Sequence, residues 1–127
     1  MAYMEFNINP CHNRVSDCTV RAIATAFGIC WEEAFDRLAS HARRMCDMPD
    51  ADVVWWDFLE KEGFRYHAVR SDCPSCVTVA EFCRAHPHGV YVIATQRHVL
   101  CAIDGDWYDT WNSGNEIVLH TWEDPEQ

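Results

Sequence analysis

Apolar residues recur with helical spacing through the first half of the chain. In DCTVRAIATAFG, residues 17–28, the apolar positions follow the i, i+3, i+4, i+7 pattern of one helix face, and Gly28 is a typical C-terminal stop. This apolar stripe consists of Val20, Ile23, Ala24 and Phe27. The same spacing predicts a second helix over residues 31–45 and a third over roughly 51–62, before Gly63.

The second half of the chain contains short apolar or alternating runs that are typical of strands. These runs are FRYHAV, GVYVIA, HVLCAI, DWYDT and IVLHTW. Between the first two runs, Thr78 and Glu81 have the spacing of a capping box, which predicts a short helix ending before Pro87. Asp104-Gly105 is a two-residue hairpin signal between HVLCAI and DWYDT.

The order of these elements predicts one domain of the α+β class over residues 1–127. Residues 1–16 contain turn-forming residues and no clear period, so we expect them to be irregular. Helices come first and strands second, which favours N-terminal helices packed on a C-terminal antiparallel sheet. The apolar fraction of 49% is high enough for a domain of 127 residues to bury a core without disulfides or metals.

Charge and cysteine content limit the binding partners and the cellular location that the sequence predicts. Twenty acidic residues against ten basic ones give a net charge of -10, which disfavours binding to nucleic acid or to anionic membranes. The sequence MAYMEFNINP has neither the basic nor the apolar region of a signal peptide, so we expect a cytoplasmic protein. The eight cysteines are then expected to be reduced, and to serve in packing, metal binding or chemistry.

Cys18 is placed differently from a packing residue. At 100° per residue its side chain points away from the apolar stripe of its helix, toward the side of Arg21 and Thr25. It also lies in the first helical turn, where the helix dipole favours a thiolate. These two features raise the hypothesis that Cys18 is a nucleophile, against the simpler interpretation of core filler.

The predicted hairpin places a histidine and an aspartate together. With Asp104 and Gly105 in the turn, the expected pairs are Ile103 with Asp106, Leu100 with Asp109, and His98 with Trp111. His98 and Asp109 then share one face as diagonal neighbours, about 7–8 Å apart at the backbone. An aspartate that accepts from one imidazole nitrogen leaves the other nitrogen free to take a thiol proton.

The order of DCTVRAIA, HVLCAIDG and YDTWNSG resembles the small papain-like cysteine peptidases of the C39-like type. The similarity is greatest to members encoded by bacteriophages and their gut-bacterial hosts, and it covers nearly the whole chain. It implies a papain-like fold in which Cys18 is the nucleophile, His98 the general base and then acid, and Asp109 the residue that orients the imidazole.

The resemblance also implies an activity and a setting. A member of this family would be a thiol protease or a related hydrolase, with no cofactor and with a peptide or protein as its substrate. It would cleave a peptide, isopeptide or other amide bond through a thioester. If encoded by a phage, it would act in the cytoplasm of the bacterial host.

One element of the family pattern is missing. Papain-like enzymes usually take an oxyanion donor from a glutamine shortly before the cysteine, and no glutamine precedes Cys18. Asn13 is the best substitute, with Asn9 and His12 as weaker candidates. Loss of one such donor typically lowers the rate about 10²–10³-fold. The alternative function is therefore a weak or inactive papain-like binding module, such as a phage factor that engages a host protein.

Two further features allow other interpretations. Cys73 and Cys76 form a C-x-x-C pair that could make a structural zinc site with Cys46 and Cys83, although Cys83 could equally pack in a helix.

Trp111 lies beside the predicted catalytic face, where it could contact substrate or pack in the core.

Overall fold

The computed structural model describes residues 1–70 and 72–126; Ser71, which belongs to the predicted loop SDCPSC, and Gln127 lie outside the described residues. The helices are α1 (Cys18–Phe27), α2 (Trp31–Met45), α3 (Asp52–Lys61) and α4 (Val79–Ala85). The strands are β1 (Tyr3–Glu5), β2 (Arg65–Ala68), β3 (Val90–Thr95), β4 (His98–Ile103), β5 (Asp106–Asp109) and β6 (His120–Glu123).

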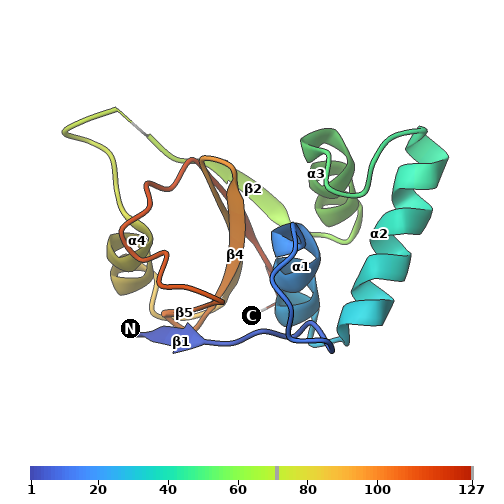
Figure 1. The fold of residues 1–127 in the computed structure, drawn as a ribbon. Coiled ribbons are helices and arrows are strands. Elements are labelled where there is room, and N and C mark those ends of the chain that lie inside the picture. Colours follow the sequence, from blue (N-terminus) through green and yellow to red (C-terminus); the bar gives the residue numbers. More distant parts are fainter. Residues whose placement is uncertain (71, 127) are drawn as a thin grey trace.

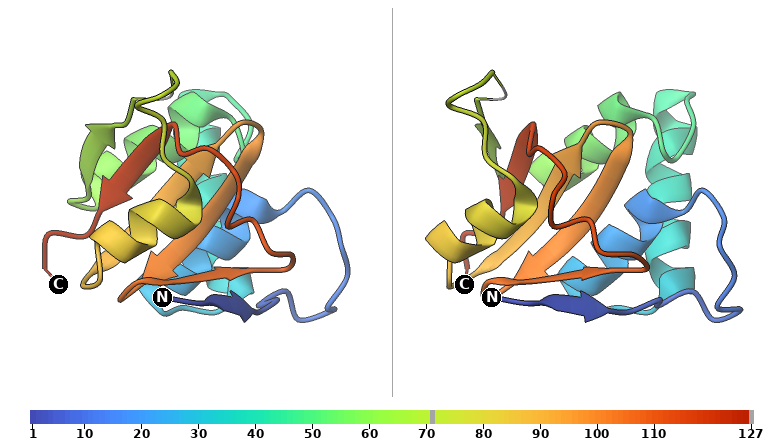
Figure 2. Two further views of the ribbon diagram at one scale, coloured as in Figure 1. Left: turned by 90° about the vertical axis from the view of Figure 1, so that its left-hand side faces the viewer. Right: turned by 60° about the vertical axis from the view of Figure 1, so that its left-hand side comes forward.

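The strands form one sheet in the order β1-β5-β4-β3-β6-β2. Pairing is antiparallel throughout except at one edge, where β1 runs parallel to β5 with Tyr3 opposite Trp107. The α+β class is therefore confirmed, and the C-terminal strands are antiparallel as expected. The expectation for residues 1–16 is wrong only at β1, which adds a parallel edge strand. A strand of three residues is too short to give a periodic signal, and its partner lies far along the chain (Figure 2).

Helices cover both faces of the sheet. The helices α1, α2 and α3 lie on one face, as expected for N-terminal helices, and α4 lies on the other (Figure 1). Alternate residues of β3 point to the two layers, with Val92 packed toward α1 and Ile93 toward α4. This arrangement explains why all six residues of β3 are buried and why its sequence reads as a continuous apolar run.

Helix α1 is buried on two sides, which one apolar stripe does not predict. It packs against β4 and β3 on one side and against α2 on the other, so that Thr19 and Ala22 are buried along with the stripe. Gly28 ends the helix in the left-handed conformation, at φ 67°. Cys18 and Arg21, which point away from the stripe, lie next to His98 of β4 and Asp109 of β5, respectively.

The predicted hairpin is confirmed and determines the geometry of the site. Ile103 pairs with Asp106 across a turn in which both Asp104 and Gly105 have positive φ, as in a type I′ turn. His98 begins β4 and Asp109 ends β5, so both residues lie at the same end of the hairpin. The predicted capping box at the start of α4 is also confirmed.

No helix within residues 1–70 and 72–126 has the length and apolar character needed to cross a membrane.

Candidate active site

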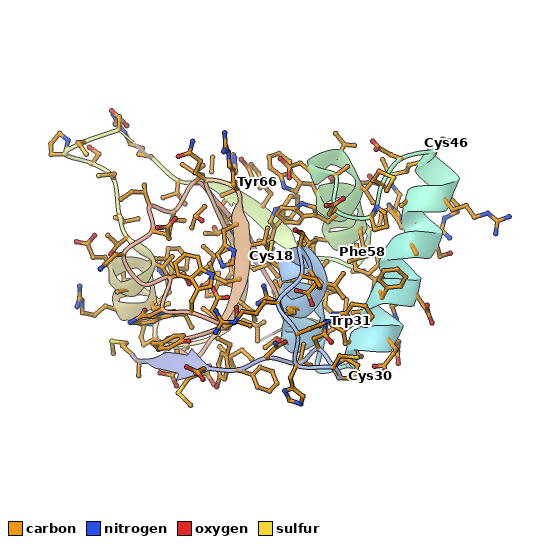
Figure 3. All side chains as sticks on the ribbon, viewed as in Figure 1. Cys18, Cys30, Trp31, Cys46, Phe58 and Tyr66 are labelled. Carbon is orange, nitrogen blue, oxygen red and sulfur yellow. The ribbon has the colours of Figure 1, made fainter. Side chains whose placement is uncertain are left out.

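The N-terminus of α1 meets the start of β4. Cys18, the first residue of α1, is partly buried and packs at the edge of the core beneath the sheet (Figure 3). The imidazole of His98 and the backbone at Val99 lie near enough to the thiol to lower its pKa. The two side chains, which the sequence placed on a helix and on a separate hairpin, are thus neighbours that line the same two clefts.

His98 is held on its other side by Asp109. The ring Nε2 lies 2.6 Å from Oδ2 of Asp109, which leaves Nδ1 free to exchange a proton with the Cys18 thiol. Burial by itself would lower the pKa of His98. The hydrogen bonds and negative charges of Asp109 and Cys18 outweigh burial and raise the pKa to about 9.

The pKa of the Cys18 thiol moves in the opposite direction. Burial by itself would raise it, but the hydrogen bond with His98 and the backbone bond at Val99 outweigh this effect. The positive charges of His98 and Arg21 add to them, and the pKa lies below the ordinary value of 9.0. Both shifts favour a thiolate paired with an imidazolium.

Asp109 is fully engaged by donors. Its Oδ2 accepts from His98 and from Ser113 Oγ, the latter at 2.6 Å, and its Oδ1 accepts from the backbone N–H of Thr110 at 2.8 Å. Arg21 Nη1 also donates to Oδ1, at 3.3 Å. Burial would raise the pKa of Asp109, but the bonds from His98, Ser113 and Thr110 and the charge of His98 hold it below its usual value. The carboxylate is therefore ionised and fixed in position.

A second buried carboxylate shares Arg21. The Nε of Arg21 donates to Asp17 Oδ1 at 2.8 Å, while Asn9 and Trp31 donate to Oδ2 at 2.9 and 3.0 Å. Asp17 therefore does not cap α1 with its side chain. The guanidinium, only 12% exposed, lies between the carboxylates of Asp17 and Asp109.

The residues around Asp109 were not identified from the sequence as parts of the site. The i, i+4 spacing of Asp17 and Arg21 was a visible signal for an ion pair, but only the two-sided burial of α1 places that pair beside the hairpin. Ser113 had a weaker signal, its position four residues after Asp109 in a turn-rich segment.

Two clefts meet at Cys18 and His98. The first, which we call the α3-side cleft, has a volume of about 440 Å³ and extends toward Asp52, Trp55 and Trp56. The second, the Trp111-side cleft, has a volume of about 420 Å³ and extends toward Arg14 and Trp111. Ser16, Cys18, Arg97 and His98 line both clefts. An extended chain laid across the thiol would therefore have room on both sides.

The three candidate oxyanion donors lie in different environments. Asn13 is exposed and lines the Trp111-side cleft together with Cys18. Asn9 is buried, with its amide donating to Asp17 and its carbonyl accepting from the N–H of Cys11, so it is not free to donate to a substrate. His12 lines neither of the two clefts. Asn13 is thus the one of the three that accompanies Cys18.

Trp111 is a surface residue. Its side chain is 40% exposed, and its ring centroid lies 4.9 Å from that of His98. The interpretation of Trp111 as a core residue is therefore wrong. The indole covers one side of the imidazole and forms part of the Trp111-side cleft.

The alternative zinc site is not assembled. Cys46 is the C-cap residue of α2, at the far side of the molecule from the loop that carries Cys73 and Cys76 (Figures 1 and 3). Cys83 belongs to α4 and is buried in the core between that helix and the sheet. The Sγ atoms of Cys73 and Cys76 lie 3.0 Å apart, but within the described ranges no three His, Cys, Asp or Glu side chains are grouped as metal ligands. The four cysteines of the zinc hypothesis thus lie on three separate segments, the C-terminus of α2, the loop that carries Cys73 and Cys76, and α4, and the described structure does not group them.

No known protein family, curated protein or solved structure matches the chain.

Proposed function

We propose that this protein is a cysteine hydrolase of the papain-like type, which cleaves a peptide, isopeptide or other amide bond. The observation that carries the proposal is the arrangement of three groups: the imidazole of His98 lies beside the thiol of Cys18, whose pKa it lowers, and it is bonded to the carboxylate of Asp109 at 2.6 Å. An isolated structural histidine has no need of a thiol on one nitrogen and a buried, ionised carboxylate on the other.

The reaction follows from this geometry. The Cys18 thiolate attacks the carbonyl carbon, and the electron pair of the C=O bond moves to oxygen. When the carbonyl forms again, the C–N bond breaks and the amine leaves with a proton from His98. Water then attacks the thioester while His98 takes its proton, and the acid product leaves as the thiol is restored. Asp109 keeps the ring oriented and stabilises its charged form.

The oxyanion formed in the first step needs donors. The backbone N–H of Cys18 belongs to the first turn of α1, where the N–H groups have no partner within the helix. We assign the second donor to the side-chain amide of Asn13, which lines the same cleft as Cys18. Such donors contribute most when they are fixed before the reaction begins.

The first test is the reactivity of Cys18. Limited treatment with iodoacetamide, followed by mapping of the modified cysteines by mass spectrometry, should show Cys18 reacting at least about tenfold faster than the exposed Cys11, Cys30 and Cys46 at neutral pH. The variant His98→Ala should lose this advantage. A matched control is His67→Ala, because His67 also pairs with a carboxylate but is exposed on β2.

The second test is turnover. A pool of internally quenched peptides should be cleaved by the wild-type protein and not by Cys18→Ala, which removes the nucleophile while the fold is checked by circular dichroism. If Cys18 reacts no faster than the exposed cysteines, or if Cys18→Ala cleaves the pool as well as the wild type, the proposal is wrong.

A further inference from the structure

The two clefts beside Cys18 differ in the charges that line them. The α3-side cleft carries the carboxylates of Asp50 and Asp52 as well as two tryptophans. The Trp111-side cleft carries Arg14, Arg21 and Arg97, with Asp17 as its only carboxylate among the described lining residues. Because Arg97 lines both clefts, the α3-side cleft holds two carboxylates and one arginine, and the Trp111-side cleft is the more positive of the two.

Two of the three arginines are available to a ligand. Arg21 is occupied by Asp17 and Asp109. Arg14 and Arg97 are exposed, and neither forms an ion pair with a carboxylate of residues 1–70 or 72–126. In a chain of net charge -10, two unpaired guanidinium groups beside one cleft form a local positive surface against the prevailing charge.

The place of Arg97 in the fold is a separate observation. Arg97 occupies the two-residue turn between β3 and β4, across which Thr95 pairs with His98, and its φ of 62° is the positive φ that such turns use. Arg97 directly precedes His98 and lines both clefts, so this turn holds a guanidinium at the point where the clefts meet.

We propose that the Trp111-side cleft binds a carboxylate of the substrate, so that the enzyme prefers amides carrying an acidic side chain or a free C-terminal carboxylate on that side of the cleaved bond. Arg14 and Arg97 supply the guanidinium donors, which match a carboxylate geometrically. The exposed ring of Trp111 supplies an apolar surface for the carbon chain that bears the carboxylate. This inference rests on the proposed function, because it assigns the substrate class of the same site.

A pair of alkylating agents tests the charge preference without any turnover. Iodoacetate and iodoacetamide transfer a carboxymethyl and a carbamoylmethyl group, respectively, to the Cys18 sulfur as the S–C bond forms and iodide leaves, so only the first reagent carries a carboxylate. The measured quantity is the ratio of the two rates at Cys18. We expect Arg97→Asn and Arg14→Gln each to lower this ratio about two- to fivefold, because the iodoacetate rate should fall more than the iodoacetamide rate. Asparagine is chosen at Arg97 because it tolerates positive φ.

Matched variants separate a local effect from a general one. Arg43→Gln removes an exposed arginine of α2 that lies outside both clefts and should leave the ratio unchanged. Arg97→Lys keeps the charge and should preserve most of the ratio. The difference between wild type and Arg97→Asn should shrink as salt is added, since these charges are exposed.

Peptides then identify the source of the carboxylate. Quenched peptides with Glu or Gln beside the cleaved bond, each with a free or amidated C-terminus, should show a preference for the charged form of one of these groups, and Arg14→Glu should reverse it. The inference is overturned if both arginine variants keep the wild-type alkylation ratio, if Arg43→Gln lowers it equally, or if wild type cleaves all four peptides alike. Slow iodoacetamide alkylation of wild-type Cys18 would instead overturn the proposed function, and the ratio remains measurable in that case.

Discussion

Arg21 and Asp109 lie 88 positions apart in the chain, yet Arg21 Nη1 donates to Asp109 Oδ1 at 3.3 Å. The same guanidinium donates through Nε to Asp17, so one cation lies between two buried carboxylates. Neither carboxylate could remain ionised at this depth without a partner. Arg21 thus helps to hold the carboxylate of Asp109, which in turn orients His98. No hydrogen bond in the described structure joins Arg21 to His98 itself.

Replacement of Arg21 should destabilise the fold strongly. In Arg21→Met, the carboxylates of Asp17 and Asp109 stay buried without their shared cation, and removal of one partner from a buried ion pair costs about 3–5 kcal/mol. Urea unfolding at neutral pH measures this loss. The loss should diminish in acid, because protonation of Asp17 and Asp109 removes the charges that Arg21 balances.

Arg37→Gln is the control for this prediction. Arg37 forms an i, i+4 ion pair with Glu33 on the exposed face of α2, and such surface pairs contribute about 0–1 kcal/mol. Equal losses in the Arg21 and Arg37 variants would show that the buried network adds nothing to stability.

The alkylation rate of Cys18 should depend on pH in a way that His98 controls. Because the pKa of Cys18 lies below 9.0, its thiolate persists below pH 9 and is lost only as the pH falls through the lowered value. In His98→Ala the hydrogen bond and the charge of the ring are gone, so the midpoint of the rate profile should move to higher pH. Iodoacetamide rates over about pH 5 to 10 give both midpoints. An unchanged midpoint would contradict the contact between the two side chains.

Hydrolysis should lose activity at the alkaline end. The pKa of His98 is raised to about 9, so the imidazolium that protonates the leaving amine is present below that pH and disappears as the pH rises through it. The kcat/KM profile should therefore fall above about pH 9, and Cys18 alkylation, which needs no proton donor, should not.

The sequence predicted the parts of the site whose positions depend on local periods. The helical period located Cys18 in the first turn of α1, and the two-residue turn fixed the register that brings His98 toward Asp109. It did not predict the environment of Arg21, since this requires α1 to be buried on two sides. The parallel strand β1 was missed because its pairing depends on a partner far along the chain.

Asn13→Ala should separate hydrolysis from thiol reactivity. If the Asn13 amide stabilises the oxyanion, its loss should lower kcat about 10²–10³-fold. Alkylation of Cys18 forms no oxyanion, so its rate should stay within about twofold of wild type. Asn9→Ala is the contrasting variant. It removes a buried donor from Asp17 and should lower the free energy of unfolding by about 1–3 kcal/mol. Parallel losses of both rates in Asn13→Ala would exclude the oxyanion role.

Gly114→Ala should disturb the loop that holds Ser113. A methyl group at Gly114 would lie 2.7 Å from Cζ2 of Trp107, a buried ring with no room to move. Overpacking of this kind costs about 1–3 kcal/mol, measured by thermal or urea unfolding. The variant Trp107→Phe lacks the clashing atom, so Gly114→Ala should cost markedly less in that background. Equal costs in the two backgrounds would mean that the ring is not the obstacle.

The thiol of Cys18 and the hairpin residues that lower its pKa come from opposite ends of the chain, and this affects when the thiol becomes reactive during synthesis. Cys18 lies in the first helix of the chain, whereas its partners lie on the β4–β5 hairpin near the opposite end, and contacts such as that of Tyr3 with Asp109 span 106 positions. Long-range pairings of this kind form late, after local helices. A growing chain on the ribosome therefore carries Cys18 as an ordinary thiol, and the shift of its pKa arises only when the C-terminal strands have joined the sheet.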